Sequence, residues 1–301
     1  MIVAGVAIIV VALAVALKSS GGLAGVALTQ VMSLSMMLTT IVMQWTVVET
    51  SIGSVSRIKN FVENTPSENK TNEVFEPPLA WPRAGKICLN SVSAFYETKP
   101  DSLILRTVSL SVEGGQKIGI CGRSGSGKSS LLLLLSRMLE MKEGSIVIDG
   151  VDLSTVPRNT VRARLNIVPQ EPVFIPGTVR FNLDPRHESS DSEVVEALRR
   201  VHLLDILEAK GGLLSQLDLG FLSHGQRQLF CLAVAILRKA SIVLLDEVTS
   251  NVDRATDDLM QTIIRKQFRD CTVISIAHRL STILDFDQVV VLDCGVKGVQ
   301  G

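Results

Sequence analysis

Two long apolar segments without a charged residue open the chain. They cover residues 1–17 and 23–48, and the polar residues Lys18–Gly22 separate them. At 1.5 Å per residue, helices of these lengths would reach about 26 Å and about 39 Å, beside a bilayer core of about 30 Å. The pattern therefore predicts a hairpin of two transmembrane helices within residues 1–61.

A cleaved signal peptide is the alternative interpretation of the first segment. Ala14-Val15-Ala16 resembles a cleavage site, but no positively charged residue precedes the apolar run and a second apolar segment follows it. The second helix is expected to continue through Arg57 and Lys59 into the cytosol, and the hairpin loop to face away from it. Those two basic residues fit the positive-inside rule weakly, whereas Lys18 counts against it.

The pattern becomes polar and rich in proline over residues 62–84, which we interpret as a linker. Pro77-Pro78 and Pro82 prevent a helix there. Residues 85–301 follow, and their length suits one domain with its own core.

A glycine-rich run lies between two apolar segments of that domain. Lys117–Cys121 has the pattern of a short buried strand, and Ser130–Leu135 has that of a buried helix. Between them, residues 122–129 have the sequence GRSGSGKS, which matches G-x-x-x-x-G-K-[ST] without a gap. A Gly/Ser turn that precedes a helix by chance is the alternative interpretation.

Such a run is suited to binding phosphate. Its glycines let the backbone approach phosphate oxygens, and the loop N–H groups and the helix N-terminus supply positive dipoles. We expect Lys128 to reach the β- and γ-phosphates of ATP and the Ser129 hydroxyl to ligate Mg²⁺. The candidate ATP-binding residues are Gly122, Arg123, Ser124, Gly125, Ser126, Gly127, Lys128, Ser129 and Ser130.

Two carboxylates end a second apolar run. Ser241–Leu245 is followed directly by Asp246 and Glu247. Strand ends face the ligand in open parallel sheets, so we expect Asp246 to hold Mg²⁺ through water and Glu247 to act as general base or to orient water. A strand that ends in an ordinary polar turn is the alternative.

Composition favours a membrane part and gives no basis for nucleic-acid binding. Hydrophobic residues make up 46% of the chain and aromatic residues only 4%, the mean hydropathy is +0.34, and the apolar excess lies at the start. The formal net charge of +0 supplies no basic surface. The five cysteines have no metal-ligand spacing, and most lie in apolar runs, as expected for small buried residues in a reducing compartment.

The run Leu222–Gln226, LSHGQ, resembles the signature sequence of ABC transporters. In that family the signature contacts the γ-phosphate of ATP held by an opposing nucleotide-binding domain, which implies this role for Ser223, Gly225 and Gln226. The resemblance implies an α/β P-loop NTPase fold: an ABC-type nucleotide-binding domain with an α-helical signature subdomain, preceded by two transmembrane α-helices.

Other elements of this family occur in the expected order. Tyr96 resembles the aromatic residue that stacks on adenine, and Gln170 resembles the Q-loop glutamine that contacts Mg²⁺ and the attacking water. Ser250–Asp253 resembles the D-loop, and His278 resembles the histidine that hydrogen-bonds the γ-phosphate. Taken singly, each would be an ordinary core, surface or loop residue. The resemblance implies Glu247, His278 and Gln170 as catalytic residues and Ser129, Gln170 and Asp246 as Mg²⁺ ligands.

The amino-acid sequence is similar to the second nucleotide-binding domain of the multidrug-resistance-associated, or C, subfamily, in particular to fungal members. The similarity lies in His224 within the signature, in Trp81-Pro82, in Asn182–Pro185 and in Gln226–Cys231.

Two features depart from the family pattern. Val234 replaces a frequent arginine, which puts a helix contact near the signature in doubt. After Asp293 the family continues with a further strand and a helix, whereas this sequence ends in Cys294–Gly301. We therefore expect the nucleotide-binding domain, residues 85–301, to be incomplete at its C-terminus.

The resemblance implies the ATP-hydrolysing half of an exporter that moves amphipathic anions, conjugates, drugs or secondary metabolites out of the cytosol. One nucleotide domain and two helices cannot form a path alone. The implied partners are a second nucleotide-binding domain, the remaining transmembrane helices and membrane lipid, in the plasma or vacuolar membrane with the nucleotide domain in the cytosol. A nucleotide-gated regulatory relative and an inactive truncated remnant that only binds ATP are the alternatives.

Overall fold

The computed structural model describes residues 2–17, 21–65, 67–68, 70–96, 101–218, 220, 222–250, 252–277, 279, 282–293 and 295–300. The predicted hairpin loop at residues 18–20 and the candidate catalytic His278 lie outside these ranges. The chain divides into two compact units, residues 1–68 and 69–301, which are described separately as unit 1 and unit 2. The predicted linker, residues 62–84, is thereby shared between them.

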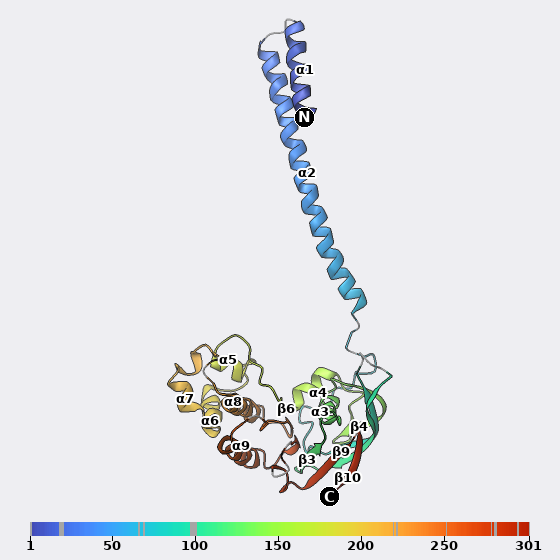
Figure 1. The fold of residues 1–301 in the computed structure, drawn as a ribbon, viewed down its shortest axis with the longest axis vertical. Helices are drawn as coiled ribbons and strands as arrows, with labels where there is room; N and C mark the ends of the chain where they lie inside the picture. The colour runs from blue at the N-terminus through green and yellow to red at the C-terminus, as the bar shows by residue number, and fades with distance from the viewer. Residues whose placement is uncertain are drawn as a thin grey trace. The chain divides into compact units, whose positions relative to one another are not determined.

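Unit 1 consists of two helices, α1 (Ile2–Ala16) and α2 (Gly21–Asn64), which lie side by side (Figure 1). Among the described residues, α2 is the helix that is long and apolar enough to cross a membrane, while α1 is apolar but shorter. A helix of α1's 15 residues reaches about 22 Å. The two apolar segments thus form helices as predicted, and α2 has the length to span a bilayer by itself.

Hydroxyl groups along α2 find hydrogen-bond partners inside the helix. Thr39 donates to the Ser35 carbonyl at 3.0 Å, and Thr46 donates to the Val42 carbonyl at 3.1 Å. Because lipid offers no partner for a polar group, such bonds to the preceding turn let Ser and Thr occupy a membrane helix.

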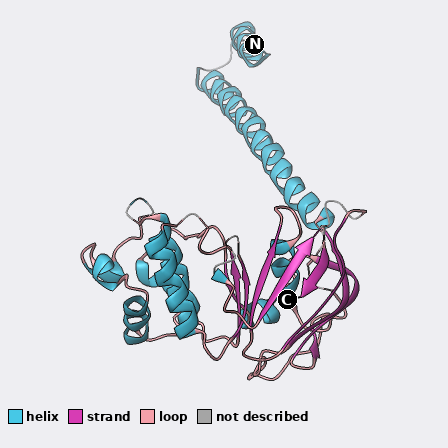
Figure 2. Ribbon diagram, turned by 60° about the horizontal axis from the view of Figure 1, so that its bottom comes forward, coloured by secondary structure: helices cyan, strands magenta, loops and turns pink. Residues whose placement is uncertain are grey.

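Unit 2 contains two sheets (Figure 2). The first has the strand order β2-β1-β4-β5 and is antiparallel throughout. The second has the order β10-β9-β3-β8-β7-β6 and is parallel except for β10, which runs antiparallel to β9. The strands are β1 (Ile87–Phe95), β2 (Leu103–Val112), β3 (Lys117–Gly122), β4 (Glu140–Ile148), β5 (Val151–Asp152), β6 (Asn166–Val168), β7 (Ile242–Asp246), β8 (Thr272–Ile276), β9 (Gln288–Asp293) and β10 (Val296–Gln300).

The helices of unit 2 fall into two groups. Figure 1 shows α5 to α9 gathered on one side of the unit, and α3 and α4 among the strands on the other. The helices are α3 (Lys128–Leu135), α4 (Arg158–Arg164), α5 (Val179–Leu183), α6 (Asp191–Arg200), α7 (Leu204–Glu208), the 3-10 helix η1 (Gly212–Leu214), α8 (His224–Leu237) and α9 (Arg254–Gln267).

Each group has its own apolar core. One core packs α3 between the two sheets and includes Ile118, Leu131 and Ile148, all fully buried. The other packs α6, α8 and α9 together and includes Phe230 and Met260. Val234, where the family often has arginine, packs against this second core, and α8 continues past it to Leu237. Burial of the apolar face therefore holds α8 in place without the arginine.

A tight turn in unit 2 holds the chain directly before β1. Asp149 and Gly150 connect β4 to β5 with φ of +47° and +81°, the conformation that favours Asp-Gly in two-residue hairpins. The Asp149 carboxylate accepts hydrogen bonds from the four consecutive N–H groups of residues 83–86, at 2.7–3.0 Å. Partial burial opposes the charged form, but these bonds outweigh it and hold the pKa of Asp149 below its usual value.

Part of the predicted linker is tied to the rest of unit 2 through charged groups, most of them buried or largely buried. Glu73 is 6% exposed and accepts hydrogen bonds from Arg137 and from Arg158, whose Nε lies 3.1 Å away. Arg158 also pairs with Glu140 at 2.7 Å, and Lys70 pairs with the same carboxylate. Since a buried charge is tolerated only when it is paired, this chain of five charged groups fixes the segment against α4 and the end of α3.

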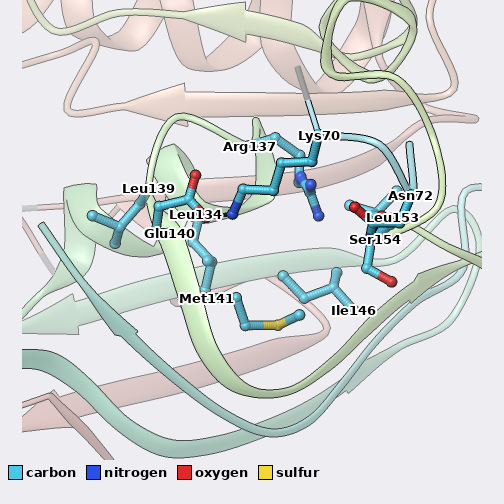
Figure 3. A pocket seen from close by; sticks show the side chains of 10 residues that line it. All are labelled: Lys70, Asn72, Leu134, Arg137, Leu139, Glu140, Met141, Ile146, Leu153 and Ser154. Atoms are coloured by element: carbon cyan, nitrogen blue, oxygen red, sulfur yellow. Dashed lines mark hydrogen bonds and ion pairs between the residues drawn. The ribbon is translucent and has the colours of Figure 1, made fainter. Parts of the chain in front are cut away.

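A small cavity of about 160 Å³ lies beside these charges (Figure 3). Lys70, Arg137 and Glu140 line its polar side, and Leu134, in the last turn of α3, contributes to its apolar side. The charged groups around the cavity already pair with carboxylates or arginines of unit 2. The cavity thus lies where the linker segment that contains Lys70 and Asn72 packs on unit 2, and no residue of the glycine-rich run lines it.

We predict that Asp149→Ala lowers the free energy of unfolding by about 1–2 kcal/mol near pH 7, since it removes the acceptor of four N–H groups. A depressed carboxyl pKa stabilises the fold above the unfolded-state pKa and loses this effect as pH falls through the folded-state value. The gap between wild type and variant should therefore narrow below the ordinary carboxyl pKa of 3.8. Thermal unfolding of the detergent-solubilised chain from pH 7 to 3 measures it.

Asp149→Asn is the matched control, because it keeps an acceptor of the same shape without the charge. It should recover part of the stability and lack the pH dependence. An Ala variant whose stability deficit stays constant down to pH 3 would contradict this account.

Candidate functional site

The glycine-rich run forms a loop between β3 and α3, as the sequence predicts. β3 ends at Gly122 and α3 begins at Lys128, with Gly125 and Gly127 at φ of +78° and +96°. Glycine accepts these values at no steric cost. At Gly122 there is also no space, since a Cβ would lie 2.2 Å from the Leu292 carbonyl oxygen of β9. A Cβ at Gly125 would meet nothing within 4 Å, so the loop is open at that point.

Hydrogen bonds hold the side chains of Lys128 and Ser129 at the start of α3. Lys128 is 6% exposed, and its ammonium donates to the carbonyls of Gly122 and Arg123, both at 3.1 Å. The Ser129 hydroxyl donates to Asp246 Oδ1 at 3.1 Å. Ser126 Oγ is buried without a hydrogen-bond partner among the described residues. The open loop at Gly125, the Lys128 ammonium and the buried Ser126 hydroxyl would suit an anionic ligand. Such a ligand would replace the internal hydrogen bonds of Lys128.

The parallel sheet brings the two carboxylates to this loop. Ile276 of β8 pairs with Ile120 of β3 on one side and with Asp246 of β7 on the other. The carboxyl ends of parallel strands meet at one edge, so the loop that follows β3 and the carboxylates that end β7 lie together. His278 follows β8 by two residues and belongs to the same stretch of chain, but it lies outside the described residues.

Asp246 and Glu247 have different surroundings. Burial raises the pKa of Asp246, and the neighbouring Glu247 charge adds to this, while the Ser129 hydrogen bond and the Lys128 charge oppose it. Glu247 is 9% exposed and has a φ of +47°. A left-handed backbone costs a residue other than glycine about 1–3 kcal/mol, and such strain concentrates at functional sites.

Gln170 contacts Glu247 directly. Its Nε2 donates to Glu247 Oε2 at 2.9 Å. Gln170 lies in the loop after β6, and β6 pairs with β7, so sheet order again sets this contact. An amide oxygen, the Ser129 hydroxyl and the Asp246 carboxylate are the hard oxygen donors that Mg²⁺ prefers, and the side chains present would suit this cation.

Tyr96, directly after β1, reaches the same loop from the other sheet. Its hydroxyl lies 3.0 Å from Ser130 Oγ, and its side chain is partly exposed. This bond fixes the ring beside Ser130, the third residue of α3. The ring is thereby held next to the end of the glycine-rich loop.

The signature residues lie at the start of α8. Ser223 is the N-cap: its hydroxyl accepts the Gln226 N–H at 3.2 Å, and the Gln226 side chain accepts the Ser223 N–H at 2.9 Å. This capping box uses acceptor oxygens, so the Ser223 hydroxyl and the Gln226 amide nitrogen keep their donor hydrogens. The helix N-terminus adds about half a positive charge. Both side chains thus retain donor groups that the capping box does not use.

Gly225 packs against the helix that follows the D-loop. A Cβ there would lie 2.8 Å from Thr256 Cγ2. Thr256 is itself held by Asp253, the N-cap of α9, through a 2.7 Å bond from its hydroxyl. Gly225 therefore permits close contact between α8 and α9.

The structure joins some of the predicted residues and separates others. Hydrogen bonds connect Ser129 with Asp246, Gln170 with Glu247, and Tyr96 with Ser130. Among the described residues, no hydrogen bond links the Ser223 or Gln226 side chain to the loop. A residue not predicted, Gln228, connects α8 to the Gln170 backbone. Its only sequence signal is a polar residue at a buried position of an apolar helix.

Comparisons with known proteins agree with this architecture. Residues 105–250 match the family described as ABC transporter. The chain is 47% identical over 98% of its length to "ABC multidrug transporter B" of Aspergillus fumigatus and 46% identical over 100% to "ABC transporter ecdL" of Aspergillus rugulosus. It covers 20% of each of these proteins, so it spans about a fifth of the length of the curated relatives it matches.

A solved structure gives the same result. "Structure of a bacterial Atm1-family ABC exporter with ATP bound" matches with a TM-score of 0.78 and 29% identity, over 92% of this chain and 48% of that one. Residues 105–250 therefore match an ABC transporter domain, and the chain has the predicted α/β P-loop NTPase fold with an apolar helical segment at its N-terminus.

We predict that Gly225→Ala lowers the free energy of unfolding by about 1–3 kcal/mol, because the new methyl group overpacks the contact with Thr256. Thr256→Ser removes the clashing Cγ2 and keeps the hydroxyl that bonds Asp253. The double variant Gly225→Ala/Thr256→Ser should thus regain most of the lost stability in thermal unfolding. Equal melting temperatures for the single and double variants would show that this contact is not the reason for glycine.

A second prediction concerns the Tyr96 ring. Tyr96→Ala should weaken ATP binding about tenfold, since stacking of a base on an aromatic ring contributes about 1–3 kcal/mol. Tyr96→Phe keeps the ring and loses only the bond to Ser130, so its affinity should stay within about threefold of wild type. Titration with a fluorescent ATP analogue measures both. Equal affinities for wild type and the Ala variant would exclude stacking.

Proposed function

We propose that this chain is the ATP-hydrolysing part of an ABC exporter. The carrying observation is the convergence of the loop 122–129, Asp246, Glu247 and Gln170 at one edge of the parallel sheet. The proposed domains are two transmembrane helices in residues 1–61, a linker in 62–84 and a nucleotide-binding domain in 85–301.

ATP would lie on the loop with its base against Tyr96. The triphosphate would take over the donors of the loop, and the Lys128 ammonium would exchange its carbonyl partners for phosphate oxygens. Gly122 to Ser130 would form the cradle. The left-handed glycines and the N-terminus of α3 support this role, since both favour an anion at the loop.

Ser129, Asp246 and Gln170 would hold Mg²⁺, which when bound would neutralise charge on the phosphate oxygens. Burial disfavours the charged form of Asp246 and raises its pKa, so a nearby cation would stabilise its carboxylate. The Ser129–Asp246 hydrogen bond already places two of the oxygen donors together.

Glu247 would orient the water that attacks the γ-phosphate and accept its proton. The Gln170 amide fixes one carboxylate oxygen of Glu247, and the strained backbone at this residue directs the side chain. His278 is proposed to stabilise charge on the γ-phosphate, by its position after β8.

Ser223, Gly225 and Gln226 would complete a second ATP site on an opposing nucleotide-binding domain. The capping box leaves the donor groups of Ser223 and Gln226 unused, and the helix N-terminus favours an anion. The remaining transmembrane helices would contact the segment after the Q-loop, where Val173 and Ile175 are 83% and 55% exposed.

The transported solute is proposed from the relatives. One is named as a multidrug transporter, and the structural neighbour is named as an exporter. We propose efflux of drugs, amphipathic anions, conjugates or secondary metabolites across the plasma or vacuolar membrane. The Trp81-Pro82 and HGQ wording supports the C subfamily and the position of second nucleotide-binding domain.

The test is Glu247→Gln, which keeps the shape of the side chain and removes its basicity. We predict that phosphate release falls at least 100-fold while ATP affinity stays within about threefold, because the carboxylate acts on the attacking water and not on ATP binding. Phosphate release is measured with two copies of the chain in each lipid nanodisc, so that one copy can supply the opposing signature.

Glu208→Gln, an exposed glutamate on α7, is the matched control and should leave phosphate release unchanged. Turnover retained by the Glu247 variant would refute its role as base. Wild type that neither binds nor hydrolyses ATP would refute the proposed function as a whole.

A further inference from the structure

Gln228 lies in the second turn of α8, and its side chain is completely buried. Its Nε2 donates to the main-chain carbonyl of Gln170 at 2.5 Å. Its Oε1 is buried without a hydrogen-bond partner among the described residues. A buried acceptor without a partner costs stability, so an apolar side chain would serve the fold better at this position.

Two further contacts attach the same stretch of chain to α8. Asn166 Nδ2 donates to the Ala235 carbonyl at 2.6 Å. Phe174 packs edge-to-face on Phe230, with ring centroids 5.3 Å apart. Together with the bond from Gln228, these contacts hold β6 and the Q-loop on α8 at the beginning, in the middle and at the end of residues 166–174.

Of these contacts, the bond from Gln228 is the one connected to the Glu247 carboxylate, through Gln170. The Gln170 backbone is held by Gln228, and the Gln170 side chain donates to Glu247 Oε2 at 2.9 Å. A shift of the Gln170 carbonyl therefore moves the amide that fixes Glu247. Asn166 and Phe174 lie four residues to either side and support the loop without touching this connection.

We propose that Gln228 is a positioning residue of the ATPase reaction, which acts through the Gln170 main chain on the Glu247 carboxylate. This inference rests on the proposed function and deepens it. Gln228 is five residues from Ser223 on the same helix, so the helix that would meet the opposing ATP also sets the geometry of the carboxylate in its own site.

The test is Gln228→Met, which has nearly the same length and volume and cannot donate a hydrogen bond. We expect kcat for ATP hydrolysis to fall about tenfold or more, since small misplacement of a reacting group is costly. The KM for ATP should stay within about twofold, because Gln228 does not touch the cradle. The melting temperature should stay close to that of wild type, because the variant removes a buried acceptor without a partner but also takes the donor from the Gln170 carbonyl.

The matched control is Gln261→Met on α9. Gln261 also has a buried Oε1 without a partner among the described residues, but it lies on a helix that does not hold the Q-loop. This variant should leave kcat and KM unchanged. A purely structural role for Gln228 would instead lower melting temperature and kcat together, and this result would overturn the inference.

Hydrogen exchange separates failure of the inference from failure of the proposed function. Amides of residues 168–174 should exchange faster in Gln228→Met than in wild type, with α8 and α9 unchanged. If wild type releases no phosphate, the proposed function fails and the kinetic role of Gln228 fails with it, while exchange still decides whether Gln228 holds the Q-loop. Wild-type protection of residues 168–174 in the variant, or an unchanged kcat, would contradict it.

Discussion

The hydrogen bond between the Ser129 hydroxyl and the Asp246 carboxylate is the contact on which the rest of the site depends. It joins the first turn of α3 to the end of β7, two elements that lie 117 residues apart in the chain. It exists because β8 pairs with both β3 and β7, so that the ends of all three strands share one edge. Sheet order thus brings the loop, the carboxylates and the Q-loop to one edge, and the Ser129–Asp246 bond fixes the loop against the first carboxylate.

A second constraint comes from α8, which serves the core and the chemistry at once. Its apolar face packs Leu232 and Phe230 into the core of the helical group, and its N-terminus presents the signature. Polar contacts from its buried face reach β6 and the Q-loop. A helix held so firmly by burial is a rigid support, which is what precise placement of a donor or an amide requires.

The parts of the site that could be predicted are those with a local signature. The glycine-rich run between a strand and a helix, and the two carboxylates after an apolar run, depend on neighbours in the sequence, and the structure has them where the pattern indicates. The fold itself is confirmed by the match to an ABC exporter structure. The bonds of Tyr96 to Ser130 and of Gln228 to Gln170 join distant segments, and no local pattern announces such contacts.

The segment before the domain shows the same limit. Its prolines exclude a helix, but composition alone does not reveal that Glu73 is buried between two arginines. Near the C-terminus, Val296–Gln300 departs from the sequence pattern of the family and still forms β10 beside β9. Strand pairing uses the backbone, so it tolerates a change of side chains that motif comparison treats as a departure.

The central claim is that the edge formed by Ser129 and Asp246 binds ATP together with Mg²⁺. Equilibrium titration of ATP into the chain, with Mg²⁺ and with a chelator, tests it most directly when wild type is compared with Asp246→Asn. We expect Mg²⁺ to raise the ATP affinity of wild type and to have little effect on the variant. An equal Mg²⁺ effect in both proteins, or no ATP binding by wild type, would contradict the account.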